Sequence, residues 1–157
     1  MNHWLLITRF LAIRLVIYLA AVAVAYVLAA GAATQSVVAS LAGMGIDVSF
    51  AGRVEMTLRD LLGMAGMFLP MVAFGLLIAF MTTALVCRYW SRARLPLYLA
   101  AGACALVCIH LGLHLAFGIT PIAIARTTGG LVIQALAGAA GGWVYVMLSR
   151  SRFARAA

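Results

Sequence analysis

The stretch LVIYLAAVAVAYVLAAGAA, from Leu15 to Ala33, decides the fold of this chain. It carries no acidic or basic residue, and a helix of this length, rising about 1.5 Å per residue, crosses the roughly 30 Å hydrocarbon core of a bilayer. Three further uncharged apolar runs follow at Leu61–Val86, Leu95–Phe117 and Gly129–Leu148. With 67% hydrophobic and 9% charged residues, the chain cannot cover a soluble globule with polar side chains. We therefore predict an all-α polytopic membrane protein, a bundle of four transmembrane helices in a single membrane domain.

The predicted spans take up most of the chain and leave one sizeable loop. The spans cover about residues 11–33, 59–87, 95–117 and 128–148, and the loop covers residues 34–58. Within this loop, Ser36–Phe50 is mildly apolar and interrupted by glycine. Such a segment is typical of a helix or folded loop on a membrane surface. We therefore predict a short amphipathic outer segment between the first two spans.

Local signals predict where helices begin and bend. Thr57 and Asp60 have the spacing of a capping box, which predicts that the second span begins there. Pro70 lies well inside that span and predicts a kink, with a backbone carbonyl freed one turn earlier. Thr120 and Pro121 have the order of an N-cap and a first helical residue, which predicts a short helix before the fourth span.

The basic residues predict the orientation of the chain. All eleven are arginine, and only Arg53, Arg59 and Arg126 fall on the side of the long loop. The other eight flank the opposite ends of the spans: Arg9, Arg14, Arg88, Arg92, Arg94, Arg150, Arg152 and Arg155. The positive-inside rule therefore places both termini in the cytoplasm, as in a bacterial-type inner membrane. The net charge of +8 is concentrated at the ends of the spans. It therefore indicates contact with anionic lipid headgroups and not binding of nucleic acid.

The N-terminal region has a competing interpretation. Arg9 and Arg14, an apolar run and the small residues Ala30, Gly31 and Ala32 are also typical of a secretory signal peptide with a cleavage site. The run is longer than a usual signal core, however. Its removal would leave three crossings and move the N-terminus to the other side. We therefore favour an uncleaved first span.

Small residues recur at every fourth position on several spans. In the fourth span these positions are Gly130, Gln134, Gly138 and Gly142; in the third they are Ala100, Cys104, Cys108, Gly112 and Ala116; in the first they are Ala21, Ala25 and Ala29. Membrane helices associate by close packing of such faces, and Gly138 with Gly142 forms a GxxxG pair. Two interpretations stay open: these faces close a tight four-helix bundle, or one of them contacts another subunit.

His110 and His114 are the most suggestive polar residues, because ionisable groups inside a span are costly and often functional. They lie four residues apart and therefore share a helix face. With Gln134, the one amide in a span, and Arg126 they form a candidate polar or ligand site near the outer side. The alternative is that the neutral histidines only hydrogen-bond across helices.

A metal or haem site is a further hypothesis. Met64, Met67 and Met71 share a face at a depth similar to that of the two histidines. Thioethers with imidazole suit copper(I), and one methionine with one histidine could ligate haem. Methionine is also an ordinary gap-filler between helices, so we predict no cofactor, with haem or copper as the alternative.

No feature of the sequence favours an enzyme. The outer loops hold no cysteine pair, which excludes quinone-linked disulfide oxidoreductases, and no nucleotide-binding or hydrolase motif is present. The spans carry no carboxylate, which argues against the usual proton- or cation-coupled transport. We predict a non-enzymatic accessory, anchor or assembly subunit that associates with copies of itself or with other membrane subunits. The alternatives are a small oligomeric channel or carrier and a haem- or metal-handling redox subunit.

Overall fold

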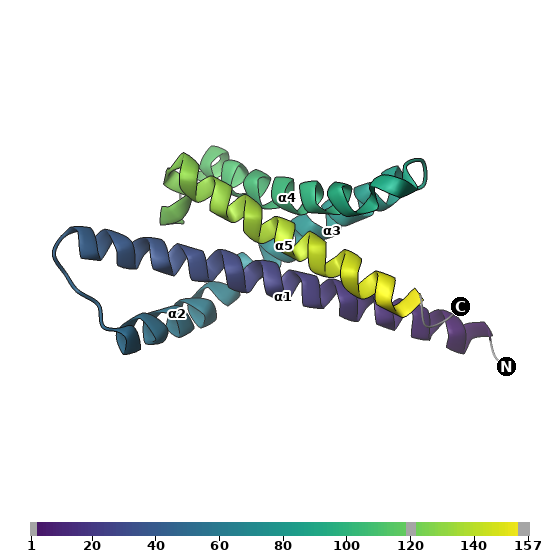
Figure 1. Ribbon diagram of the computed structural model, residues 1–157, viewed down its shortest axis with the longest axis horizontal. Coiled ribbons are helices and arrows are strands. Elements are labelled where there is room, and N and C mark those ends of the chain that lie inside the picture. Colours follow the sequence, from purple (N-terminus) through teal and green to yellow (C-terminus); the bar gives the residue numbers. More distant parts are fainter. Residues whose placement is uncertain (1–2, 119–121, 154–157) are drawn as a thin grey trace.

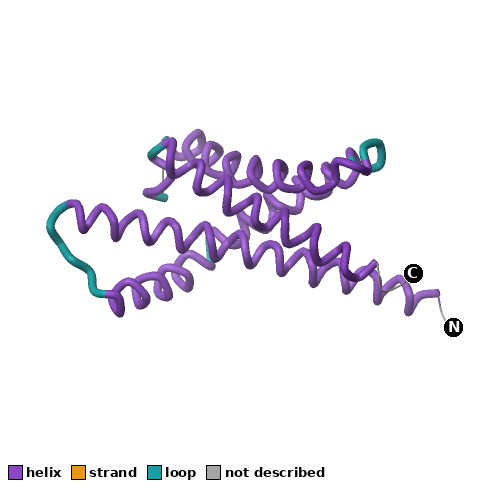
Figure 2. The backbone as a smooth tube through the Cα atoms, in the orientation of Figure 1, coloured by secondary structure: helices purple, strands orange, loops and turns teal. Residues whose placement is uncertain are grey.

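The computed structural model describes residues 3–118 and 122–153, and its elements in this part of the chain are all helices. The α-helices are α1 (His3–Gly43), α2 (Phe50–Ala65), α3 (Phe68–Val86), α4 (Arg94–Phe117) and α5 (Thr128–Phe153). Two short 3-10 helices, η1 (Ser91–Ala93) and η2 (Ala123–Arg126), precede α4 and α5. Figure 2 shows that the longest loop outside these helices connects α1 to α2.

Four of these helices, α1, α3, α4 and α5, are long and apolar enough to cross a membrane. The protein is therefore a multi-pass membrane protein with an all-α bundle, as the sequence predicts. The start of α1, the end of α5 and the α3–α4 connection lie at one end, which we call the terminal end (Figure 1). The turn between α1 and α2 lies at the other end, which we call the hairpin end (Figure 1).

The first helix is much longer than the span predicted from hydropathy. α1 has 41 residues, which corresponds to about 60 Å of helix. The apolar run ends at Ala33, but no charged residue, proline or glycine interrupts the next turns, so the helix continues to Gly43. Gly45, with φ of 80°, then turns the chain. The prediction of a separate surface segment over Ser36–Phe50 was wrong in its position, because the amphipathic element is α2.

The predicted capping box was also wrong. Ser49 is the N-cap of α2, and its side chain accepts a hydrogen bond from the amide of Gly52 at 3.2 Å. Thr57 lies inside α2, and its hydroxyl donates to the carbonyl of Arg53 at 2.8 Å. The helix begins earlier because Ser49 caps it, so residues 50–56 form its first two turns.

The apolar run Leu61–Val86 is divided between two helices. α2 ends at Ala65, and α3 begins at Phe68, so the break falls at Gly66 and Met67. The prediction that Pro70 kinks one continuous span was wrong in this respect, because Pro70 is the third residue of α3 and sits in its first turn, after the break. No helical hydrogen bond is lost there, because the first amides of a helix have no partner within it.

The closest helix contact in the bundle joins α4 to α5. A Cβ atom on Gly138 would lie 2.1 Å from the carbonyl oxygen of Gly102, and one on Gly102 would lie 2.1 Å from that of Gly138. A Cβ on Gly142 would lie 2.1 Å from the carbonyl oxygen of Tyr98. Glycine is thus required at these positions, since the two backbones touch where a side chain would stand.

The α1 helix packs against the other side of α5. Its residues Ala21, Ala25 and Ala29 are completely buried. A Cβ atom on Gly141 would lie 3.0 Å from the carbonyl oxygen of Ala21 and from the Cβ of Ala25. The alanine face of the first span therefore closes the bundle within one chain.

The small-residue face that the sequence predicts on the third span lies on a different side of α4 from the contact with α5. Ala100, Cys104, Cys108 and Gly112 are all exposed on α4, and a Cβ on Gly112 would meet nothing within 4 Å. Gly102, which does meet α5, lies two residues from both Ala100 and Cys104, or about 200° around the helix. The side that packs on α5 carries Gly102 between Tyr98 and Leu106, so a search for small residues at every fourth position selects the exposed side instead.

Candidate functional site

The structure brings His110 and Gln134 together in the middle of the bundle. His110 on α4 is 2% exposed, and Gln134 on α5 is fully buried beside it. The Gln134 side-chain amide donates to the carbonyl oxygen of Ala29 on α1 at 2.9 Å. This polar pair therefore connects three of the helices that span the membrane.

Aromatic rings extend this polar pair toward α1. The ring of Phe68, at the start of α3, lies 5.8 Å from the His110 ring and 6.0 Å from the Tyr26 ring, centroid to centroid. The hydroxyl of Tyr26 donates to the carbonyl of Leu61 on α2. His110 is thus enclosed by aromatic and apolar groups, and its position is fixed by packing as much as by polar contacts.

Two atoms of the pair lack a hydrogen-bond partner among the described residues: Nε2 of His110 and Oε1 of Gln134. A neutral imidazole can donate from Nε2, and an amide oxygen accepts, so the two atoms are chemically complementary. Within a membrane an unpaired polar atom is costly. The arrangement therefore favours pairing of His110 with Gln134, which is a helix-bridging role.

We expect His110→Gln to leave the stability of the bundle nearly unchanged. Glutamine keeps the capacity to donate and to accept with a similar reach. His110→Leu should lower the free energy of unfolding by about 0.5–2 kcal/mol, because it removes the polar partner of Gln134 in the membrane. Unfolding in mixed detergent micelles measures both. A large loss of unfolding free energy in the His110→Gln variant would contradict a helix-bridging role. It would favour a role that requires the imidazole ring itself.

The remaining candidate polar residues lie apart from this pair. His114 is exposed one turn further along α4, and Arg126 is exposed at the end of η2. The predicted N-cap at Thr120 and Pro121 falls outside the described residues, whereas η2 does precede α5. The structure therefore separates the two histidines by burial although they share a helix face.

The described residues bring few of the predicted metal or haem ligands together. Among the described residues, no group of three or more His, Cys, Asp or Glu side chains could hold a metal ion. Met67 is 59% exposed at the break between α2 and α3, and this break divides the predicted methionine face. Met64 and Met71 are half-buried, and Met64 packs against the apolar core. The ring contact of His110 is to Phe68.

A second surface of interest is the hairpin formed by α1 and α2. Polar contacts hold the two helices together: the Thr34 hydroxyl donates to the Asp60 carboxylate at 2.9 Å. The Gln35 amide donates to the Thr57 hydroxyl at 3.2 Å. These contacts hold Thr57 and Asp60 against α1, while Leu61, Met64 and Ala65 of α2 pack against the apolar core.

One exposed row of α2 is apolar. Its residues Phe50, Val54, Leu58 and Leu62 follow each other at every fourth position and are between 43% and 82% exposed. We call this set the hairpin face. Along one edge, Arg59 and Glu55 form an exposed ion pair at 2.7 Å. No residue of α2 is fully buried, so nothing in the described part of the chain covers this face.

Sequence reasoning missed the hairpin face, although its signal was present. The spacing of Phe50, Val54 and Leu58 is that of one side of a helix. The apolar runs and the Thr57–Asp60 spacing instead predict a loop over residues 34–58, which hides this helix face. Recognising Ser49 as the N-cap would have shown the pattern.

Comparisons with known proteins add no family to this geometry. The chain matches no protein-family model, no curated protein and no solved structure. The function must therefore be argued from the residues and their arrangement.

Proposed function

We propose that this chain is a non-enzymatic inner-membrane protein that acts by association, as an accessory, anchor or assembly subunit. In this proposal the hairpin face binds another membrane subunit. The observation that carries it is the exposed row of large apolar side chains on α2, on a hairpin that extends past the ends of α4 and α5 (Figure 1).

The length of α1 places the outer half of this row, Phe50 and Val54, outside the hydrocarbon core. The uncharged run of α1 from Leu15 to Ala33 already crosses a bilayer. Thr34–Gly43 adds about 15 Å of helix beyond that run. The hydrogen bonds of Thr57 with Gln35 and of Asp60 with Thr34 put Leu58 at the end of that run, and Phe50 and Val54 lie farther toward the tip of the hairpin. Lipid tails do not reach Phe50 and Val54, so these two side chains would be exposed to water in an isolated chain.

Exposed apolar area of this kind favours a protein partner. Burying apolar surface contributes about 25 cal/mol per Å², and contiguous exposed patches mark interaction sites. The hydrogen bond between Thr34 and Asp60 already holds one side of α2 against α1. A partner subunit that covers the apolar side would complete the burial of α2.

The proposal includes an orientation. The arginines of the terminal end favour a cytoplasmic location for both termini, which puts the hairpin on the other side of the membrane. We expect a reporter fused after Ala157 to be active in the cytoplasm, and one inserted between Asp47 and Ser49 to be active outside it. A reporter that is active outside after Ala157 would invert the proposed orientation.

Photocrosslinking in intact membranes tests the association itself. A photoreactive amino acid at position 58 should form an adduct with a protein of discrete mass. The same group at Phe74, which is 69% exposed on α3, serves as the matched position facing lipid and should form no such adduct. An adduct of two copies would identify the subunit as this same chain. No protein adduct at position 58 in a folded chain would contradict the proposal.

A further inference from the structure

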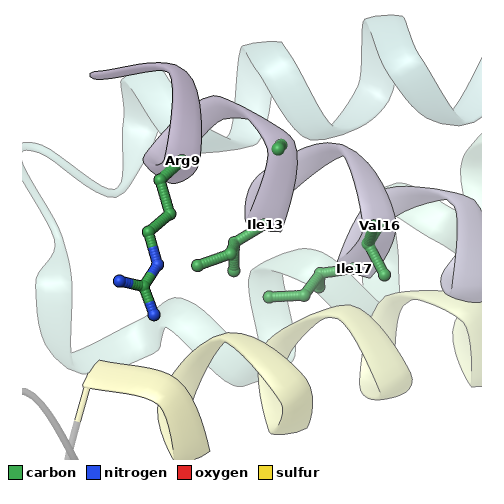
Figure 3. A pocket seen from close by; sticks show the side chains of 5 residues that line it. Arg9, Ile13, Val16 and Ile17 are labelled. Carbon is green, nitrogen blue, oxygen red and sulfur yellow. The ribbon is translucent and has the colours of Figure 1, made fainter. Parts of the chain in front are cut away.

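A groove lies along α1 at the terminal end, far from the hairpin face (Figure 3). It is lined by Arg9, Ala12, Ile13, Val16 and Ile17 and has a volume of about 300 Å³. These positions follow the spacing of one helix face, so Arg9 stands at one end and apolar side chains continue for two turns. The Arg9 side chain extends from α1 toward α5, beside Ile13 (Figure 3).

The groove changes from charged to apolar along the direction in which α1 enters the membrane. Arg9 precedes the uncharged run that begins at Leu15, whereas Val16 and Ile17 belong to that run. Arg9 to Ile17 corresponds to about 12 Å along the helix axis. A ligand that matches this order needs an anionic group at the membrane surface and a hydrocarbon chain below it.

We infer that this groove binds an anionic phospholipid, with Arg9 on the phosphate and one acyl chain along Ile13, Val16 and Ile17. The guanidinium group supplies donors and charge that suit a phosphate. The walls supply an apolar surface that a chain can follow, and α5 runs beside α1. This site is independent of the proposed association, because it lies at the other end of the bundle.

The chain offers a matched control in Arg14. It is also exposed on α1, but its guanidinium lies over the Phe10 ring, at 4.4 Å from the centroid, and it does not line the groove. Arg14→Gln and Arg9→Gln therefore remove the same charge from the same helix end. A bulky residue at position 12, which is exposed, would fill the groove without altering either arginine.

Native mass spectrometry of the full chain, titrated with dioleoylphosphatidylglycerol or dioleoylphosphatidylcholine, tests the site. We expect the first one-to-one adduct to favour phosphatidylglycerol by about tenfold, which corresponds to about 1.4 kcal/mol. Arg9→Gln and Ala12→Trp should each abolish that preference, and Arg14→Gln should retain it. Soluble glycerol phosphate should not compete, because it lacks a chain. Equal losses with Arg9→Gln and Arg14→Gln, or full competition by glycerol phosphate, would overturn the inference.

Discussion

Gly138→Leu is expected to prevent α5 from packing against α4. A Cβ atom at this position would lie 2.1 Å from the carbonyl oxygen of Gly102. Overpacking a filled core costs about 1–3 kcal/mol. Here the obstacle is backbone that cannot rotate away, so we expect a loss at or above the upper end of that range. Reversible unfolding in mixed micelles, followed by circular dichroism, measures it.

Gly112→Leu is the matched control for that substitution. Gly112 lies within the third span, and a Cβ there would meet nothing within 4 Å. The same change of side chain should therefore leave the unfolding free energy close to that of the wild type. If Gly112→Leu were as damaging as Gly138→Leu, the α4–α5 contact would not be the reason for the loss.

The double substitution Val54→Asp with Leu58→Asp is expected to release the chain from its complex while the bundle stays folded. Both side chains are exposed on the hairpin face, so carboxylates there leave the bundle contacts intact. Against an apolar partner surface, each carboxylate would be desolvated without a counter-charge, which is strongly unfavourable. Protein adducts from a photoreactive group at Phe50 should fall at least tenfold.

A control for added charge lies on the other helix of the same hairpin. Ala39 and Ala42 are exposed on α1. Ala39→Asp with Ala42→Asp adds the same two carboxylates outside the hairpin face and should preserve the adducts. Adducts that persist in the Val54→Asp and Leu58→Asp variant would show that the partner binds somewhere else.

The sequence was sufficient to predict the membrane helices but not their full lengths. Uncharged runs identify segments that cross a bilayer, because hydropathy reports what lipid tolerates. Helix ends depend on caps and breakers instead, and these placed the end of α1 at Gly43 and the start of α2 after Ser49. Pro70 predicts a bend in this region, but the structure has a break between two helices at Gly66 and Met67, before Pro70.

The candidate sites were harder to predict, because they depend on which side of a helix is covered. Both sides of α4 carry small residues, and only the packing of Gly102 on Gly138 shows which side faces α5. His110 and His114 share a helix face, yet only His110 lies deep enough to meet Gln134. Contacts between distant segments decide these questions, and the residue pattern along a single sequence does not show which segments will meet.

The protein mass of the particle extracted from its native membrane tests the central claim most directly. A single chain weighs 16.6 kDa. Light scattering in a mild detergent, corrected for bound detergent and lipid, should give a protein mass larger by at least one further subunit. The Val54→Asp and Leu58→Asp variant should give the mass of one chain. A wild-type particle of one chain alone, folded and extracted under the same conditions, would contradict the proposal that this protein acts by association.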